Sequence, residues 1–266
     1  NYVISLSEMV KWLADSARQL GVEIYTGFVA KELIIKDGIV TGVKLGDKGL
    51  DKEWGKQPNY QPGETLEAKV TVLGEGSLGL LVEDLVRRFG LARGRNPQVY
   101  SLGVKEIIRL PDDNTFGTNR VIHTLGFPNK PDVFGGGTLY SMESNMVAVA
   151  LIMALDWRYC DLNPQQELQL FKSHRFISHL LKDGEVVGYG AKTLPEGGCF
   201  SLPELVTDGA VIIGDAAGFT SVKKLKGLHY AIKSGILAAT AISHALERGS
   251  FSKQDLKEYE ERLAES

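Results

Sequence analysis

Cysteine is scarce in this chain, which holds only Cys160 and Cys199 among its 266 residues. Two thiols that lie far apart in the sequence exclude a disulfide scaffold and a cysteine-rich metal site. We expect both to be buried thiols in a protein of a reducing compartment. The five histidines show no metal-binding spacing, because His174 and His179 have no third ligand beside them. We expect these two histidines to lie at the surface or to cap a helix, with no metal bound.

The chain also lacks a dominant charge and a long hydrophobic run. Its 30 basic and 33 acidic residues give a formal net charge of -3, so no overall field would recruit nucleic acid, and attraction to an anionic surface must be local. The longest apolar run, MVAVALIMAL at 146–155, has about half the length that a membrane-spanning helix needs. We therefore predict a buried strand there, no membrane-spanning helix and no nucleic-acid partner.

The sequence starts at Asn1, without an initiator methionine, a basic leader or a signal-like apolar segment. Apolar residues from Leu6 to Leu20 recur every three or four positions, Ser5 or Ser7 is available as N-cap, and Gly21 follows. This pattern predicts an amphipathic helix at the very beginning of the chain. We interpret the sequence as an internal piece of a longer protein.

The next segments alternate between strand and helix patterns. VEIYTGF at 22–28 predicts a short strand, and two alternating arms around Asp37 and Gly38 predict a hairpin. Residues 46–67 are polar with little periodicity, so we expect a surface insertion there. A buried strand at 70–73 then leads through a glycine turn into a helix that ends at Gly90. Strand, glycine turn and helix in this order are typical of a doubly wound α/β layer.

From Pro97 onward, four consecutive strand-like runs separated by turns predict a mostly antiparallel sheet. Helices are expected at 164–174 and around 176–182, and strand, turn and helix return at 210–246. The predicted fold class is therefore mixed α/β (α+β). A Rossmann-like layer made of 1–96 and 197–266 is interrupted by a sheet domain at 97–196.

The pair Gly214-Asp215 follows a buried apolar stretch, where an open α/β sheet presents its ligand-binding edge. Glycine lets the backbone approach a ligand closely, and a carboxylate accepts hydrogen bonds from hydroxyls such as those of a ribose or ribityl chain. The alternative is that Asp215 only caps a helix that begins near Ala216. Gly214, Gly218 and Gly227 leave the segment bare of side chains, which favours a flat ligand against the main chain.

Several blocks, in order along nearly the whole chain, resemble electron transfer flavoprotein-ubiquinone oxidoreductase (ETF dehydrogenase) and its FixC relatives, a family of FAD-dependent oxidoreductases. The block KGLHYAIKSG is the most specific of them. The blocks are NYVISLSEMVKWLADSARQLGVEIYTGF at 1–28, KVTVLGEGSLG at 69–79, RVIHTLGFP at 120–128, FGGGTLY at 134–140 and LPEGGCFSLPELVTDGAVIIGDAAGFTSVKKLKGLHYAIKSGILAA at 194–239.

The resemblance implies roles for individual residues. Residues 1–96 and 197–266 would form the FAD-binding domain and 97–196 the ubiquinone-binding domain, and the enzyme would pass electrons from reduced electron transfer flavoprotein to ubiquinone through FAD. Gly135 and Gly136 match the glycine pair that lines the quinone pocket. The residues that match FAD-binding positions are Gly214 and Asp215 at the ribityl chain, Gly227 and Leu228 at the flavin ring, Val29 at the adenine end, and Gly74 and Gly76 in the middle glycine motif.

Two family features are missing from this sequence. The N-terminal βαβ unit whose glycine motif receives the FAD pyrophosphate is absent, and so is the domain whose cysteines bind an iron-sulfur cluster. This leaves open whether the piece alone holds FAD or is active. Two alternatives also stay open: a FixC-like or geranylgeranyl-reductase-like flavoprotein, and a cofactor-free fragment that acts as a binding subunit of an electron-transfer assembly.

A basic loop, VKKLKGL at 222–228, places Lys223, Lys224 and Lys226 among Val222, Leu225 and Leu228. A loop of this composition can lie on an anionic bilayer, although a solvated cluster of charges is the simpler interpretation. The resemblance favours the membrane surface. It implies peripheral, monotopic attachment at the cytoplasmic face of a bacterial inner membrane or at the mitochondrial inner membrane.

Overall fold

The structure, a computed structural model, describes residues 4–224 and 226–266. Leu225, which the sequence analysis placed in the basic loop, lies outside the described residues. Clustering of contacts divides the chain into two compact units. Unit 1 contains Val99–Leu194 together with the N-terminal segment up to Ile24, and unit 2 contains Tyr25–Gln98 and Pro195–Ser266. Each unit is therefore described by itself.

Unit 1 is built on a five-stranded sheet with the strand order β11-β7-β10-β9-β8. Its central strand β10 is antiparallel to both β7 and β9, and seven of its nine residues are buried, as expected for a strand that is covered on both faces. The apolar run therefore forms the buried strand that the sequence predicts. The strands are β7 (Tyr100–Arg109), β8 (Val121–His123), β9 (Gly135–Ser141), β10 (Met146–Ala154) and β11 (Glu185–Pro195).

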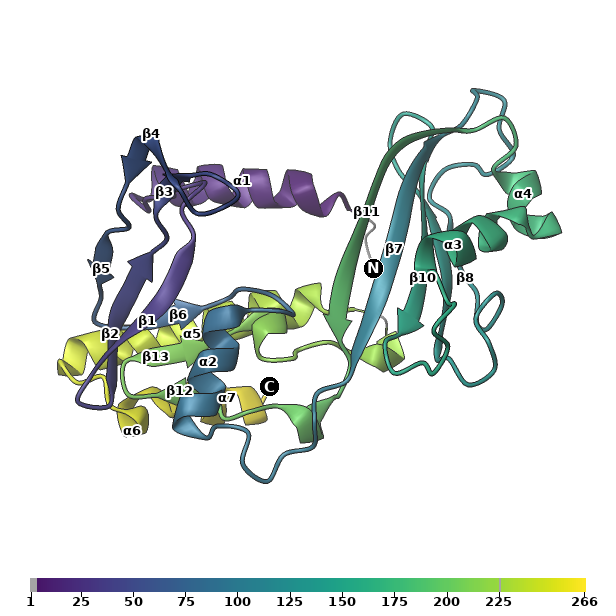
Figure 1. The fold of residues 1–266 in the computed structure, drawn as a ribbon. Coiled ribbons are helices and arrows are strands. Elements are labelled where there is room, and N and C mark those ends of the chain that lie inside the picture. Colours follow the sequence, from purple (N-terminus) through teal and green to yellow (C-terminus); the bar gives the residue numbers. More distant parts are fainter. Residues whose placement is uncertain (1–3, 225) are drawn as a thin grey trace. The chain divides into compact units, whose positions relative to one another are not determined.

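Two short helices, α3 (Pro164–Ser173) and α4 (Arg175–Leu180), pack on this sheet, as Figure 1 shows for α3 beside β10. Asn163 caps α3 by accepting hydrogen bonds from the first-turn amides, and Pro164 occupies the first helical position. His174 caps α4 through Nδ1, which accepts from the Phe176 N–H at 3.3 Å. The capping role expected for His174 is confirmed.

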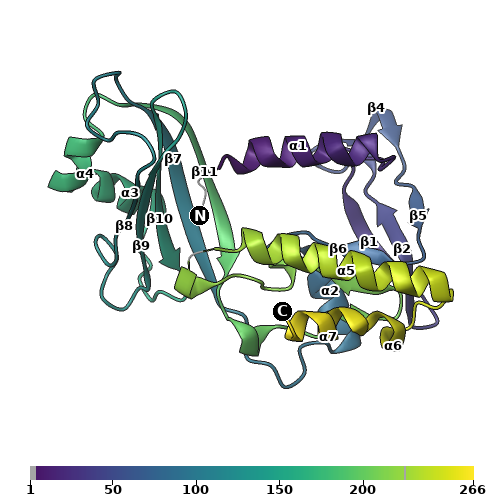
Figure 2. The same cartoon turned by 180° about the vertical axis from the view of Figure 1, so that it is seen from behind.

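The core of unit 2 surrounds a small sheet with the order β12-β13-β6. β6 and β13 run parallel although more than a hundred residues separate them in sequence. Figure 2 shows α5 running alongside α6 and α7, which it contacts. The elements are β6 (Thr71–Leu73), α2 (Leu80–Phe89), β12 (Val206–Thr207), β13 (Ala210–Ile212), α5 (Leu228–Arg248), α6 (Lys253–Leu256) and α7 (Glu258–Ala264).

A second, three-stranded sheet of unit 2 has the order β1-β2-β5. The predicted hairpin joins its first two strands, and Asp37 and Gly38 both have positive φ, at 52° and 82°, as a two-residue hairpin turn requires. β2 contacts β6, and α2 contacts β1, so this sheet shares the core of unit 2. Its strands are β1 (Ala30–Lys36), β2 (Ile39–Leu45) and β5 (Thr65–Glu67).

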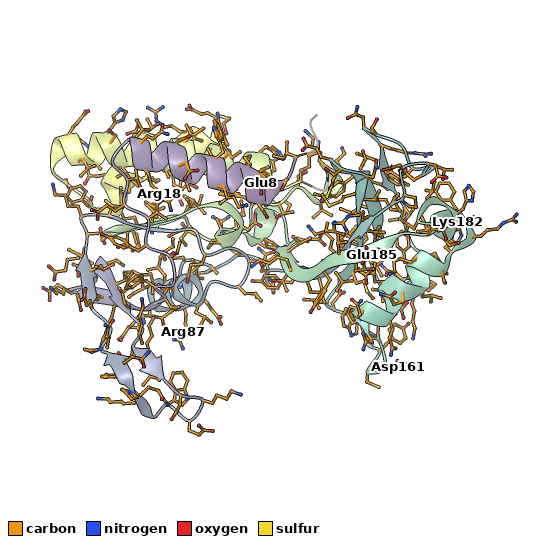
Figure 3. The ribbon with its side chains drawn as sticks, turned by 90° about the horizontal axis from the view of Figure 1, so that it is seen from above. Glu8, Arg18, Arg87, Asp161, Lys182 and Glu185 are labelled. Atoms are coloured by element: carbon orange, nitrogen blue, oxygen red, sulfur yellow. The ribbon has the colours of Figure 1, made fainter. Side chains whose placement is uncertain are left out.

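The N-terminal helix α1 (Leu6–Gln19) forms as predicted, with Ser5 as N-cap. Glu8 and Lys11 form an ion pair at 2.8 Å, and Asp15 and Arg18 form another at 2.9 Å; in each pair the two residues are about one helical turn apart. Figure 3 labels Glu8 and Arg18 on this helix. None of its residues is buried, and the Trp12 side chain is 65% exposed. Tertiary packing therefore adds little to this helix, which depends on its cap and its surface ion pairs.

Two predictions are wrong. Residues 22–28 form no strand, because Val22 and Tyr25 are exposed and no neighbouring strand pairs with them in the part of the chain that is described. Cys160 and Cys199 are both exposed, since one lies in a loop and the other begins a 3-10 turn. The polar segment 46–67 has no buried residue, as expected for a surface insertion. It also contains strands that were not predicted: β3 (Lys48–Leu50) and β4 (Lys56–Gln61), which pair with each other, and β5.

Candidate functional site

The candidate site begins where the two parallel strands of unit 2 end side by side. Leu73 is in register with Ile212, and the Ile213 N–H donates to the Leu73 carbonyl at 3.0 Å. A Cβ atom on Gly74 would lie only 3.4 Å from the Ile213 side chain. The carboxyl ends of the strands thus place Gly74 next to the Ile213-Gly214 peptide, at the edge where open α/β sheets bind ligands.

Gly214 is fixed against helix α5. Its φ is +62°, and its buried N–H donates to the Ser234 hydroxyl at 3.0 Å. That hydroxyl in turn donates to the Ala231 carbonyl at 2.9 Å. A Cβ atom on Gly214 would lie 3.5 Å from Ala231 Cβ. Glycine is therefore favoured here mainly because of the left-handed backbone conformation, and the serine holds the turn and the helix together.

Asp215 lies beside the beginning of α5. A Cβ atom on Gly227, the N-cap of the helix, would be 3.1 Å from Asp215 Oδ1 and 3.3 Å from the Phe219 carbonyl oxygen. The alternative that Asp215 caps a helix near Ala216 is not supported, because Gly214–Ala216 is a single 3-10 turn (η2) with Asp215 inside it. The structure therefore brings Gly74, Gly214, Asp215 and Gly227 into one group.

The N-terminus of α5 carries no acidic residue in its first turn and no side-chain cap at Gly227. The first intrahelical bond runs from the Ala231 N–H to the Gly227 carbonyl at 2.9 Å, so helix geometry leaves the N–H groups before Ala231 without intrahelical acceptors. Together they give this end a partial positive charge. Leu228, the first residue of the helix, is half-buried at this end.

The basic loop leads directly into this helix end. Lys223 and Lys224 belong to a 3-10 turn, η3 (Val222–Lys224), and their side chains are exposed. Lys226 is exposed as well, and its carbonyl accepts a hydrogen bond from the Ser221 N–H at 2.9 Å. The loop is thus closed by a backbone bridge between Ser221 and Lys226, and it adds positive charge near the N-terminus of α5.

Thr220 connects this group to a cavity of about 870 Å³ in unit 2. Its Oγ1 is buried without a hydrogen-bond partner in the described part of the chain, and it lies 3.4 Å from the position of a Cβ atom on Gly227. An unpaired buried hydroxyl favours a ligand or an ordered water beside it. The cavity is lined by Arg95, Cys199, Phe219, Thr220, Tyr230 and Lys233, among others.

Of the two remaining predicted FAD-binding residues, Gly76 lies close in sequence to Gly74 of the glycine group, whereas Val29 lies beside another sheet. Gly76 lies in the turn after β6 with φ +82°, and the preceding Glu75 accepts from the Val82 N–H at 2.8 Å, which ties the turn to α2. Val29 is 71% exposed at the entrance of β1, where its carbonyl accepts from the Gly46 N–H at 2.8 Å. Val29 therefore belongs to the other sheet, and the structure does not join it to the glycine group.

In unit 1, the missing side chains of Gly135 and Gly136 make room for the protein's own backbone. A Cβ atom on Gly135, whose φ is +144°, would lie 2.1 Å from the Ile152 carbonyl oxygen. A Cβ atom on Gly136 would lie 2.1 Å from the Thr124 carbonyl oxygen. Close packing of neighbouring segments thus requires both glycines, whether or not a ligand also approaches them.

Sequence reasoning missed Ser234, Glu75 and Thr220. Ser234 could have been found as a polar residue at a core position, since Ala231 and Ala238 lie three and four residues away on the same face of the helix. Among the described residues, no group of three or more histidine, cysteine or acidic side chains could hold a metal ion. No described helix is long and apolar enough to cross a membrane.

Comparison with known proteins relates the chain to one family. Residues 100–194 match the family described as ETF-QO, ubiquinone-binding. The chain is 43% identical over 265 residues to a probable electron transfer flavoprotein-ubiquinone oxidoreductase of Schizosaccharomyces pombe, with 99% of this chain and 42% of the relative covered. It is 40% identical over 261 residues to the electron transfer flavoprotein-ubiquinone oxidoreductase of Pseudomonas aeruginosa, with 97% of this chain and 47% of the relative covered. The chain thus spans less than half the length of these relatives.

The fold is also similar to solved structures. A geranylgeranyl bacteriochlorophyll reductase-like protein from Thermoplasma acidophilum has a TM-score of 0.70 at 18% identity, with 97% of this chain and 58% of that chain covered. A flavin-dependent brominase has a TM-score of 0.68 at 18% identity, with 98% of this chain and 60% of that chain covered. At this identity the similarity shows the fold, and the predicted mixed α/β fold with a Rossmann-like layer is confirmed.

Proposed function

We propose that this chain, a relative of the electron transfer flavoprotein-ubiquinone oxidoreductases along nearly its whole length, is part of an FAD-dependent enzyme that passes electrons from reduced electron transfer flavoprotein to ubiquinone. The supporting observation in the structure is the convergence of Gly74, Gly214, Asp215 and Gly227 at the carboxyl ends of β6 and β13. The activity belongs to a protein of which the chain spans about two fifths, judged by its relatives.

The residues present fit FAD. The space at Gly227 is bordered by a carboxylate and by the orphaned Thr220 hydroxyl, as expected for a site that takes a ligand with hydroxyl groups and ring nitrogens. When bound, FAD would accept electrons one at a time and supply two of them for the reduction of a quinone to a hydroquinone.

Each predicted FAD-binding residue then has a separate task. Gly214 and Asp215 would receive the ribityl chain, with the carboxylate accepting from its hydroxyls. Gly227 and Leu228 would offer backbone N–H groups and the positive end of α5 to the flavin ring. Gly74 and Gly76 would keep the neighbouring turn free of side chains, and Val29 would meet the adenine end.

Unit 1 would hold the quinone. The supporting observation is that residues 100–194 match a family described as ubiquinone-binding and that these residues form the greater part of unit 1. The main chain around Gly135 and Gly136 is the proposed lining. An iron-sulfur cluster would have to be held elsewhere in the longer protein, because two cysteines are too few for one.

The basic loop is the proposed contact with the membrane. Lys223, Lys224 and Lys226 are exposed beside the N-terminus of α5, and clustered lysines are attracted to anionic lipid headgroups. The proposed location is peripheral attachment at the mitochondrial inner membrane or, in bacteria, at the cytoplasmic face of the inner membrane. Relatives from eukaryotes are named mitochondrial, which supports the organelle alone.

Two alternatives predict different behaviour. A FixC-like or geranylgeranyl-reductase-like flavoprotein, for which the similarity in fold is the support, would bind flavin but would not reduce a quinone. A cofactor-free binding subunit would not bind flavin.

Titration of the full chain with FAD tests the proposal. We expect the flavin absorption band near ~450 nm to shift and the flavin fluorescence to be quenched on binding. Substitution of Asp215→Ala should weaken this binding, whereas Asp208→Ala should leave it unchanged, because Asp208 bonds the Lys253 N–H behind β12. A chain that stays colourless after titration and gel filtration would exclude the flavin site in this piece.

A further inference from the structure

A buried amide lies over the first residue of β9 in unit 1. Asn129 is only 8% exposed, and its Nδ2 donates a hydrogen bond to the Ile152 carbonyl at 3.1 Å. A Cβ atom on Gly135 would lie 2.6 Å from the same Nδ2. The side chain of Asn129 therefore fills the space that glycine leaves on this side of the strand.

The orientation of this amide is determined by its neighbour. A carbonyl oxygen can only accept a hydrogen bond, so the NH₂ group of Asn129 must face Ile152 and the Oδ1 atom must face away from it. Oδ1 is buried and has no hydrogen-bond partner among the described residues. A buried acceptor of this kind is uncommon in folded proteins. It indicates a donor, an O–H or N–H group, that the described residues do not supply.

Exposed apolar side chains lie on the two segments that backbone hydrogen bonds bring together beside Asn129. The Gly126 N–H donates to the Gly135 carbonyl at 3.2 Å, and the Asn129 N–H donates to the Gly126 carbonyl at 2.9 Å. Leu125 and Phe127, which flank Gly126, are 81% and 48% exposed, and Phe134, which precedes Gly135, is 55% exposed. These two segments thus combine one buried acceptor that has no partner among the described residues with exposed apolar side chains, a combination that suits a ring compound carrying a hydroxyl.

We propose that Asn129 Oδ1 accepts a hydrogen bond from a hydroxyl of the reduced quinone, so that unit 1 binds the hydroquinone more tightly than the quinone. The inference rests on the proposed quinone site. The oxygens of a quinone only accept hydrogen bonds, whereas a quinone that has gained two electrons and two protons carries two O–H donors. An acceptor that cannot turn into a donor therefore distinguishes the two forms, and Asn129 is a specificity-determining residue for the reduced form.

Binding of both forms to the full chain tests this inference. Decylubiquinone and its hydroquinone are titrated separately without oxygen, and the dissociation constants are measured by calorimetry. One hydrogen bond to a buried acceptor should make the hydroquinone bind about fivefold to tenfold more tightly. In Asn129→Leu, a change that keeps the side-chain size, the two constants should agree within about twofold. Equal binding of both forms by the native chain would overturn the inference.

A test on the ligand side does not depend on how the variant folds. The dimethyl ether of the hydroquinone keeps the ring and the tail but has no O–H donor. We expect the native chain to bind it no more tightly than the quinone. Tighter binding of the ether, or an unchanged preference in Asn129→Leu, would overturn the role of Asn129 alone. If neither redox form binds the native chain, the quinone assignment of unit 1 fails, and this inference fails with it.

Discussion

The backbone N–H of Gly214 donates a 3.0 Å hydrogen bond to the hydroxyl of Ser234, twenty residues further along the chain. Ser234 is fully buried in the middle of α5, and the turn at Gly214 ends strand β13. On the same strand, the buried Tyr259 hydroxyl of α7 donates to the Ile212 carbonyl at 3.2 Å. Two helices are therefore bonded to the strand end that leads into Gly214-Asp215, and they fix the candidate site from behind.

Removal of the Ser234 hydroxyl should destabilise unit 2. Ser234→Ala leaves the buried Gly214 N–H without an acceptor, which costs about 1–3 kcal/mol of unfolding free energy. Urea unfolding followed by circular dichroism measures this loss. Thr240→Ala is the matched control, since its hydroxyl bonds the Ile236 carbonyl on the exposed side of the same helix, and we expect a change within about 0.5 kcal/mol. Equal losses in both variants would contradict a special role for Ser234.

Two glycines of one segment should differ in their effect on flavin binding. In Gly227→Ala, the added Cβ would lie 3.1 Å from Asp215 Oδ1, in the space proposed for FAD. We expect the dissociation constant for FAD to rise at least about tenfold, equivalent to about 1.4 kcal/mol. Gly235→Ala is the control, because an added Cβ there meets no atom within 4 Å. Fluorescence titration gives both constants, and weakened binding in the control would point to a general effect on α5.

A buried ion pair in unit 1 should be essential for its stability. Glu106 of β7 is only 4% exposed and accepts hydrogen bonds from Lys172, from Gln169 at 2.8 Å and from Gln165 at 3.0 Å, all on α3. Lys172→Met would leave the buried carboxylate without its counter-charge, at a cost of roughly 3 kcal/mol. Lys182→Met is the control, since Lys182 is exposed and pairs with the exposed Asp183 at 3.9 Å; this substitution should change stability by less than about 0.5 kcal/mol.

The same carboxylate should make stability depend on pH. Burial acts to raise the pKa of Glu106, but the hydrogen bonds from Lys172, Gln169 and Gln165 and the charge of Lys172 outweigh it, so the pKa is lowered overall. Its stabilising contribution is therefore present above about pH 4.3, the ordinary glutamate value, and is lost as the pH falls through the lowered pKa. Urea midpoints between pH 3 and pH 7 give the profile.

In Lys172→Met this dependence should weaken, because the hydrogen bond and the charge of Lys172 no longer lower the pKa of Glu106, and only the hydrogen bonds from Gln169 and Gln165 still oppose the effect of burial. The variant should therefore gain less stability than the native chain as the pH rises above about 4.3. The difference between native chain and variant should thus be smallest at acid pH and grow toward neutral pH. A difference that does not change with pH would show that Glu106 is not the group responsible.

Local patterns predicted the elements whose partners are close in sequence or strongly apolar. The Asp37-Gly38 hairpin, the buried run of β10 and the helix ending at Gly90 need no distant information. That Gly74, Gly214, Asp215 and Gly227 form one group was predicted from a family resemblance. The positions of glycine turns in a sequence do not by themselves predict which turns lie close together in the fold.

Features that depend on distant neighbours were missed. VEIYTGF has the composition of a strand, but within 4–224 and 226–266 no strand pairs with it. Cys199 is exposed at the beginning of a 3-10 turn. The sequence did not single out Asn129, because only the fold brings the Ile152 carbonyl to its NH₂ group. The strands at 46–67 lack apolar periodicity. Instead, Asp47 bonds the Gly63 N–H at 2.8 Å and Asp51 bonds the Gly55 N–H at 2.6 Å.

The basic loop should decide whether the chain binds anionic membranes. Lys223, Lys224 and Lys226 are exposed, and each lysine near an anionic bilayer contributes about 1 kcal/mol. Replacing all three by glutamate should abolish flotation with liposomes that contain anionic lipid, whereas the native chain floats. Because the attraction is electrostatic, added salt should weaken flotation of the native chain.

A control with the same change in charge separates local from overall electrostatics. Lys31, Lys52 and Lys69 are exposed in unit 2 and lie outside the loop, so their replacement by glutamate should leave flotation nearly unchanged. Both triple variants carry the same net charge, and an attraction that depended only on net charge would be lost equally in both. If the two variants float equally well, or if the native chain stays at the bottom of the gradient, the loop is not a membrane contact and its lysines only solvate the surface.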